Sequence, residues 1–216
     1  MSIKTMKSYG LFLLSIFIMG SGISLVTLAH LGTTPITAPP YVLSLSIPIS
    51  FGVLTMFANI IFVLIEIIVL RKDFPKEQYL QLIVGPLLGL SIDFWSLIIT
   101  HIPTSFYLIQ LLMVVVGCII IAYSTTLQLK ANVVNNPAEG LVKAFVIKTS
   151  KSFGTIKLYF DISLVIIAIV ISLVSFGSIT GVREGTIISA LIIGPIIKVL
   201  QTMNVKKKDI LHNSLF

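Results

Sequence analysis

The sequence predicts an all-α integral membrane protein with six transmembrane helices, built as two inverted three-helix repeats. First, the 216 residues are 56% apolar and only 11% charged, with a mean hydropathy of +1.07, whereas soluble domains carry about 25% charged residues. Second, six apolar runs are long enough to cross a hydrocarbon core of ~30 Å, which needs about 20 helical residues. Third, residues of the first half recur in the second half at a nearly constant spacing.

The six apolar runs are separated by short charged, polar or glycine-containing breaks. We expect one membrane domain over residues 1–216, with a first repeat at 9–99, a second repeat at 105–203 and a basic tail at 204–216. The expected spans are residues 9–30, 51–70, 79–99, 105–127, 153–175 and 185–203. Small residues such as Gly22 and Gly117 within these spans predict close helix–helix packing.

The internal duplication is visible in individual residues. Pro35, Ser50, Phe51 and Gly52 recur 102 positions later as Pro137, Ser152, Phe153 and Gly154. Asn59 and Asp161, polar residues in apolar surroundings, have the same spacing. Gly85-Pro86 recurs 109 positions later as Gly194-Pro195. A duplicated unit in a membrane chain is typical of transporters with a pathway between the two halves.

Two connections differ from ordinary loops. Residues 31–50 hold four prolines and no charge, and residues 129–152 hold Asn135-Asn136-Pro137. Both are too apolar for solvated loops and too broken for spanning helices. Irregular backbone is tolerated at membrane depth only where it is buried in protein or lines a wet cavity. We therefore predict re-entrant or broken segments at both places, and expect Pro39 and Pro40 to cut short any helix in the first.

The placement of lysine and arginine predicts the topology. With the N-terminus in the cytoplasm, the connections that face the cytoplasm hold nearly all the basic residues, and Arg183 is the one exception. This pattern obeys the positive-inside rule and places both termini in the cytoplasm. Since each repeat has three spans, the second repeat is inverted relative to the first. We expect a multi-pass protein of the plasma membrane, the bacterial inner membrane.

The broken segments carry the candidate binding residues. Asn136-Pro137-Ala138-Glu139 has the pattern of a helix start, with Asn at the N-cap, Pro at the first position and Glu completing a capping box. Thr34-Pro35 is a weaker counterpart. Two interpretations remain open: the two starts face each other across a binding site, or they cap interfacial helices without a ligand. The predicted substrate-binding residues are Thr33, Thr34, Pro35, Thr37, Asn59, Asn135, Asn136, Pro137 and Glu139.

Few charged residues lie inside the spans. Asp161 follows Lys157 by four residues, so the two share a helix face and can pair, although an intramembrane carboxylate also suggests a proton or ion pathway. Asp93 has no basic neighbour in the sequence and is the second candidate for such coupling, or it reaches the interface beside Trp95. We expect Glu66, near the end of its span, to extend toward water.

Several classes of function lack support in the sequence. No metal-ligand spacing, phosphate loop, dinucleotide fingerprint or catalytic constellation is present, so we expect no metal, no cofactor and no enzymatic activity. The net charge of +7 reflects topology residues, and we expect no nucleic-acid binding. Asn136-Pro137-Ala138 is only a weak match to the paired tripeptides of water channels.

Several of these motifs together resemble the YczE/YitT-like bacterial membrane proteins. They are the run 181–190, the following Gly194-Pro195-Ile196-Ile197, the segment 31–35, Phe51-Gly52 and Asn136-Pro137. The resemblance covers about residues 10–202 and implies a polytopic bacterial inner-membrane protein of undefined activity. Within the run, Arg183-Glu184 is either a gate ion pair over the pathway or the polar cap of the last span.

Two functions remain as hypotheses. The first is a transporter or exporter of a small solute of unknown identity, which works between the two inverted repeats. The second is an accessory or substrate-capture membrane subunit of a larger complex. The expected partners are the lipid bilayer, a small solute, and a further copy of the chain or another membrane subunit.

Overall fold

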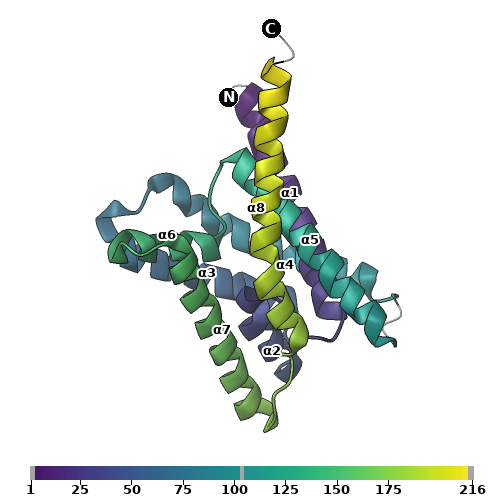
Figure 1. Cartoon of the computed structure of the whole chain (residues 1–216). Helices are drawn as coiled ribbons and strands as arrows, with labels where there is room; N and C mark the ends of the chain where they lie inside the picture. Colours follow the sequence, from purple (N-terminus) through teal and green to yellow (C-terminus); the bar gives the residue numbers. More distant parts are fainter. Residues whose placement is uncertain (1–2, 103–104, 214–216) are drawn as a thin grey trace.

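The computed structural model describes residues 3–102 and 105–213, with side chains for 6–102 and 105–203. Within these residues the chain is helical and has no strand. The six long helices are α1 (Ile3–Leu28), α3 (Phe51–Leu70), α4 (Gln81–Ile99), α5 (Tyr107–Ala131), α7 (Phe153–Phe176) and α8 (Glu184–Asn213). Two short helices, α2 (Ala38–Ser46) and α6 (Pro137–Thr149), and 3₁₀ turns at Pro35–Thr37, Arg71–Asp73 and Lys76–Leu80 complete the fold (Figure 1).

The all-helical membrane class is confirmed. Six helices of the described part are long and apolar enough to cross a membrane, and their positions agree with the predicted spans to within a few residues at most ends. The last helix continues to Asn213 instead of ending near residue 203. The side chains of the predicted basic tail, 204–216, lie outside the described residues.

The two broken connections fold as short helices. Asn136 caps α6 by accepting a hydrogen bond from the backbone N–H of Ala138, and Ser50 and Ser152 cap α3 and α7 in the same way. The expectation that Pro39 and Pro40 shorten the helix of the first connection is wrong. Both prolines lie in the first turn of α2, where proline is tolerated because the first N–H groups of a helix have no intrahelical acceptor.

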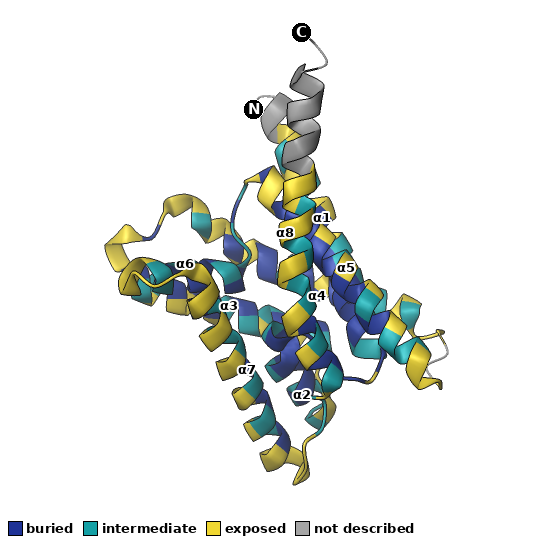
Figure 2. Cartoon of the chain, in the orientation of Figure 1, coloured by how far each residue is buried: buried dark blue, intermediate teal, exposed yellow. Residues whose placement is uncertain are grey.

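The hydrophobic core lies where α1, α4 and α5 meet. Buried residues of these three helices form the largest apolar cluster, and Figure 2 shows them as a dark region beside the largely exposed α7 and α8. Gly117 permits a close approach of α5 to α1: a Cβ there would lie 2.5 Å from Cγ2 of Val26 and 2.8 Å from the carbonyl oxygen of Gly22. The predicted role of small residues in helix packing is therefore confirmed.

The short helices cross between the halves of the chain. Helix α2 packs against α7, and α6 packs against α3, so each short helix contacts a long helix of the other half. Helix α3 also packs closely along α4. In contrast, α7 and α8, which occupy the same places in the second half, diverge toward the end of the molecule that carries both termini (Figure 1).

Candidate functional site

A cavity of about 540 Å³ lies where α7 and α8 diverge. Both halves of the chain line it, because α1, the Pro35–Thr37 turn, α3 and α4 contribute from the first half, and α5, α6, α7 and α8 from the second. Its apolar wall includes Met19, Ile23, Phe62, Leu88, Ile121 and Ile193. Eight of the predicted site residues line it: Thr34, Pro35, Thr37, Asn59, Asn136, Glu139, Lys157 and Asp161.

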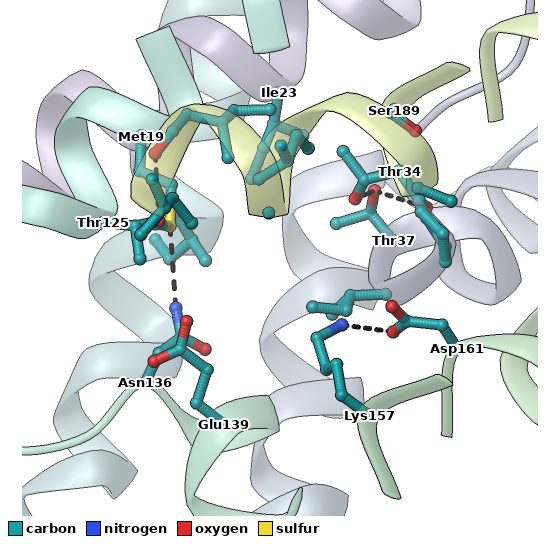
Figure 3. Close-up of a pocket in the computed structure, with 18 of the residues that line it drawn as sticks. Met19, Ile23, Thr34, Thr37, Thr125, Asn136, Glu139, Lys157, Asp161 and Ser189 are labelled. Atoms are coloured by element: carbon teal, nitrogen blue, oxygen red, sulfur yellow. Dashed lines mark hydrogen bonds and ion pairs between the residues drawn. The ribbon is translucent and has the colours of Figure 1, made fainter. Parts of the chain in front are cut away.

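Threonine hydroxyls form the polar surface that the first half contributes. Oγ1 of Thr37 lies 2.7 Å from Oγ1 of Thr34 and 2.9 Å from Oγ1 of Thr33. All three side chains are buried, and Figure 3 shows Thr34 and Thr37 turned toward each other at one end of the cavity. A hydroxyl both donates and accepts, so this cluster can rearrange to meet either kind of polar ligand atom.

The start of α6 contributes the opposite polar surface. Oδ1 of Asn136 caps the helix, and its Nδ2 donates to the thioether sulfur of Met19 at 3.5 Å. Glu139 makes no hydrogen bond within the described part of the chain, so the predicted capping box is only half formed. Since a thioether is a weak acceptor, a ligand oxygen would be a better partner for the Asn136 amide than Met19 is.

Charged side chains surround the remaining part of the cavity. Lys157 and Asp161 form the predicted ion pair on α7, with side chains 27% and 17% exposed. Figure 3 shows this pair across the cavity from Thr34 and Thr37, with Glu139 on the same side as Lys157. Burial raises the pKa of the Glu139 carboxyl group, while the positive charges of Lys143 and Lys157 act in the opposite direction. The cavity thus offers both cationic and anionic contacts.

The end of the cavity away from the termini is closed by contacts between the two halves. The Arg183 guanidinium donates to the carbonyl oxygen of His30 at 3.2 Å and also pairs with Glu184 at 3.1 Å. The backbone N–H of Gly185 donates to the carbonyl oxygen of Leu31 at 2.7 Å. The connection after α1 is therefore fastened to the start of α8.

The duplicated glycines have different surroundings in the two halves. A Cβ on Gly52 would lie 2.1 Å from the carbonyl oxygen of Gly89, and one on Gly85 would lie 2.9 Å from Cβ of Asn59. At their counterparts, Gly154 and Gly194, a Cβ would meet no atom within 4 Å. The α3–α4 contact is thus closed, and the corresponding α7–α8 contact is open.

Six predicted site residues do not line the large cavity. Thr33 lies behind Thr37 and fastens the connection to α8, since its backbone N–H donates to Oγ1 of Thr186 at 3.2 Å. Asn135 lines an adjacent cavity of about 200 Å³. The others are Pro137 in the first turn of α6, Asp93 of α4, which contacts the start of α3, and Arg183 and Glu184 at the closed end.

Sequence reasoning missed the polar group behind α6. Glu66 was expected to extend toward water, but its side chain is 2% exposed, and Gln81 is fully buried. A Cβ on Gly140 of α6 would lie 2.5 Å from Oε2 of Glu66, so the short helix covers the carboxylate. The position of Glu66 near a helix end concealed this burial, because the helix that covers it is distant in sequence.

The chemistry of the cavity suits binding. Hydroxyl, amide, ammonium and carboxylate groups face an apolar wall. Among the described residues, no group of three His, Cys, Asp or Glu side chains could hold a metal ion.

Comparison with known proteins gives a family and no function. No curated protein and no solved structure matches the chain significantly. One family model matches residues 6–202, which include the whole cavity lining and all the long helices except the first residues of α1 and the last residues of α8. The chain belongs to that family, described as a family of unknown function (DUF6198).

Proposed function

We propose that the protein is a small-solute transporter of the plasma membrane that binds its solute in the cavity between two inverted repeats. The observation that carries this proposal is the cavity itself, which both halves line and which is closed at one end and open at the other. Substrate sites of inverted-repeat transporters lie where discontinuous helices of the two halves meet. The Thr34–Thr37 segment and the start of α6 meet in this way.

The repeats differ as two halves of an alternating-access transporter would. Helices α3 and α4 are in contact through Gly52 and Gly85, while Gly154 and Gly194 face open space. By the positive-inside rule the open end, which carries Lys143, Lys157 and Lys198, faces the cytoplasm. This is the arrangement expected for a state open to the cytoplasm. The resemblance to YczE/YitT-like proteins agrees with a bacterial inner-membrane location.

The lining supports a solute with an apolar body and at least one ionised group. Aliphatic and aromatic side chains form most of the wall, and Lys157, Asp161 and Glu139 provide charge of both signs. Such a mixed lining is usual for sites in which apolar contact supplies affinity and a few polar groups fix orientation.

Substitution of two cavity residues tests the assignment. Asn136→Ala and Asp161→Asn are each expected to abolish uptake or efflux in cells while the purified variants stay folded. Asp73→Asn is the matched control, because Asp73 is an exposed carboxylate that pairs with Lys148 outside the cavity. Normal transport by both cavity variants would refute the site.

One observation favours the alternative of an accessory or capture subunit. Lys198 stands where the first repeat has Gly89, at the 109-residue spacing. A Cβ on Gly89 would lie 2.4 Å from the carbonyl oxygen of Gly52, so α7 and α8 cannot close by the same contact. Co-purification with an ATPase pair would favour the subunit, whereas solute movement by the chain alone in liposomes would favour the transporter.

A further inference from the structure

A second buried polar site lies outside the large cavity, where α3, α4 and α6 cross. Oε2 of Glu66 and Oε1 of Gln81 are buried and lack hydrogen-bond partners among the described residues. Both lie beneath Gly140, since a Cβ there would lie 2.5 Å from Oε2 of Glu66 and 2.8 and 3.0 Å from Nε2 and Oε1 of Gln81. Two convergent buried acceptors without a donor are costly, and a proton held between them would satisfy both.

The neighbouring hydrogen bonds fix the orientation of the Gln81 amide. The Lys143 ammonium can only donate, and it donates to Oδ1 of Asn135. Nδ2 and the backbone N–H of Asn135 then both donate to Oε1 of Gln78, each at 3.2 Å. Because Oε1 of Gln78 is an acceptor, Nε2 of Gln81 donates to it, at 2.8 Å.

This series of hydrogen bonds starts from two unambiguous donors, the Lys143 ammonium and the backbone N–H of Asn135. The amides of Asn135, Gln78 and Gln81 therefore cannot be reversed without loss of hydrogen bonds. It leaves Oε1 of Gln81 as the unpartnered atom of that amide, next to Oε2 of Glu66 beneath Gly140. An ionised Glu66 would place a second acceptor beside this oxygen, which is unfavourable. A protonated Glu66 would instead donate a hydrogen bond to it.

We propose that Glu66 holds a proton, which its carboxyl group donates to Oε1 of Gln81. A metal cation fits the site less well. Hard cations take six or more oxygen ligands, whereas only these two acceptors are unpartnered, and Oε1 of Gln78 already accepts three hydrogen bonds. A proton needs only the two oxygen atoms present.

Few charged groups face this site. Lys143 of α6 lies near enough for its charge to act on Glu66, and it opposes a metal cation more than a neutral acid. Helix α2 offers only the Tyr41 hydroxyl as a titratable group, and the one carboxylate of α4, Asp93, accepts hydrogen bonds at the start of α3. Besides Lys143, α6 carries Glu139, which precedes Gly140 and lines both cavities, and the turn after α3 carries Asp73, which pairs with Lys148.

Loss of the proton would act on α6. The Glu66 carboxylate would require Gln81 to turn its Nε2 toward it. Oε1 of Gln81 would then face Oε1 of Gln78, and the repulsion would disturb the hydrogen bonds that Gln78 accepts from Asn135, the residue before the α6 N-cap. The proton would leave to water in the 200 Å³ cavity, which Gln78, Asn135 and Lys143 line. Since Asn136 and Glu139 of α6 also line the large cavity, protonation would set the position of one of its walls. This coupling rests on the proposed transport, whereas the proton site does not.

Infrared difference spectroscopy of the full-length protein in lipid at neutral pH tests the proton site. Wild type minus Glu66→Gln is expected to show the C=O band of a protonated carboxyl group, and wild type minus Glu77→Gln, an exposed glutamate, is expected to lack it. Only carboxylate bands in the Glu66→Gln difference would overturn the proposal. If Glu66→Gln does not fold, Gln81→Met serves instead: removal of the acceptor must shift the band, and an unshifted band refutes the pairing.

Two further readouts separate the alternatives. A sodium-dependent rise in unfolding temperature at fixed pH, present in wild type and absent in Glu66→Gln, would show that the site binds a cation and would refute the proton. In proteoliposomes, Glu66→Gln is expected to lose the response of solute flux to a pH gradient. If the wild-type protein shows the carboxyl band but moves no solute, the transport proposal is refuted and the proton site is retained. If it moves solute but shows no band, the proton site is refuted and the transport proposal is retained.

Discussion

The carboxylate of Asp93 accepts a hydrogen bond from the backbone N–H of Gly52, at 2.8 Å, and this contact fastens the start of α3 to α4. Ser50 reinforces it by donating from Oγ to the same carboxylate at 2.6 Å. The corresponding residue of the second repeat is Thr202, whose hydroxyl instead donates to the carbonyl oxygen of Lys198 in its own helix. The two halves of the chain therefore differ in whether their second and third long helices are joined at this place.

Asp93→Ala removes this fastening and is expected to lower stability while ligand binding persists. Hydrogen bonds to charged groups contribute about 1.5–3 kcal/mol each, and the exposed edge of this site reduces that value, so we expect a loss of about 2 kcal/mol. Chemical unfolding of the purified variant in detergent measures the loss. Unchanged stability together with lost transport would instead favour the coupling role that the sequence suggested for Asp93.

The matched substitutions Gly52→Ala and Gly154→Ala test the asymmetry of the two repeats. Gly52→Ala is expected to be strongly destabilising, because its Cβ would lie 2.1 Å from a backbone oxygen and a backbone atom cannot yield as a side chain can. Gly154→Ala has open space and is expected to change the unfolding temperature little. Equal effects of the two substitutions on thermal stability would show that the α7–α8 gap is closed in the membrane.

Arg183→Gln is expected to loosen the closed end of the cavity. The guanidinium bridges the His30 carbonyl oxygen and Glu184, and a shorter neutral side chain cannot span both. A cysteine at Thr34, in a Cys118→Ala background, should then react faster with a membrane-impermeant thiol reagent added from the side away from the termini. An unchanged labelling rate would indicate that the backbone contact of Gly185 with Leu31 is sufficient to close this end.

Glu139→Gln is expected to change the pH dependence of stability. Because burial raises the pKa of Glu139 in the folded protein, the folded state holds this proton to a higher pH than the unfolded state. The stabilisation that protonated Glu139 contributes is therefore lost as the pH rises through and above the ordinary carboxyl range. The variant should be more stable than wild type at neutral pH and no different in acid, as thermal unfolding across pH would reveal. A stability difference independent of pH would contradict this.

The sequence predicted the parts of the fold that local pattern controls. The six spans follow from apolar length alone, and the caps at Ser50, Asn136 and Ser152 follow from residue type and position. The Lys157–Asp161 ion pair was also predictable, because a spacing of four residues places both on one helix face. These features depend on neighbours in the chain and need no tertiary information.

The arrangement of the site could be predicted only in part. The duplication pointed to Thr34, Thr37, Asn136 and Glu139, which the structure brings to one cavity. It could not reveal that α7 and α8 stand apart while α3 and α4 touch, because repeated residues carry no information on which repeat is closed. The burial of Glu66 under Gly140 depends on a crossing of α3 and α6, and no local pattern predicts such a crossing.

Counterflow exchange in liposomes that contain only this chain tests the central claim most directly. A solute that raises the unfolding temperature of the purified protein is first identified by thermal-shift screening, since a ligand of the native state raises apparent stability. Labelled solute outside should then exchange for unlabelled solute inside with wild type and with Asp73→Asn, and should not exchange with Asp161→Asn. Binding without exchange by the wild-type protein would contradict the transporter and leave a capture subunit as the function of this chain.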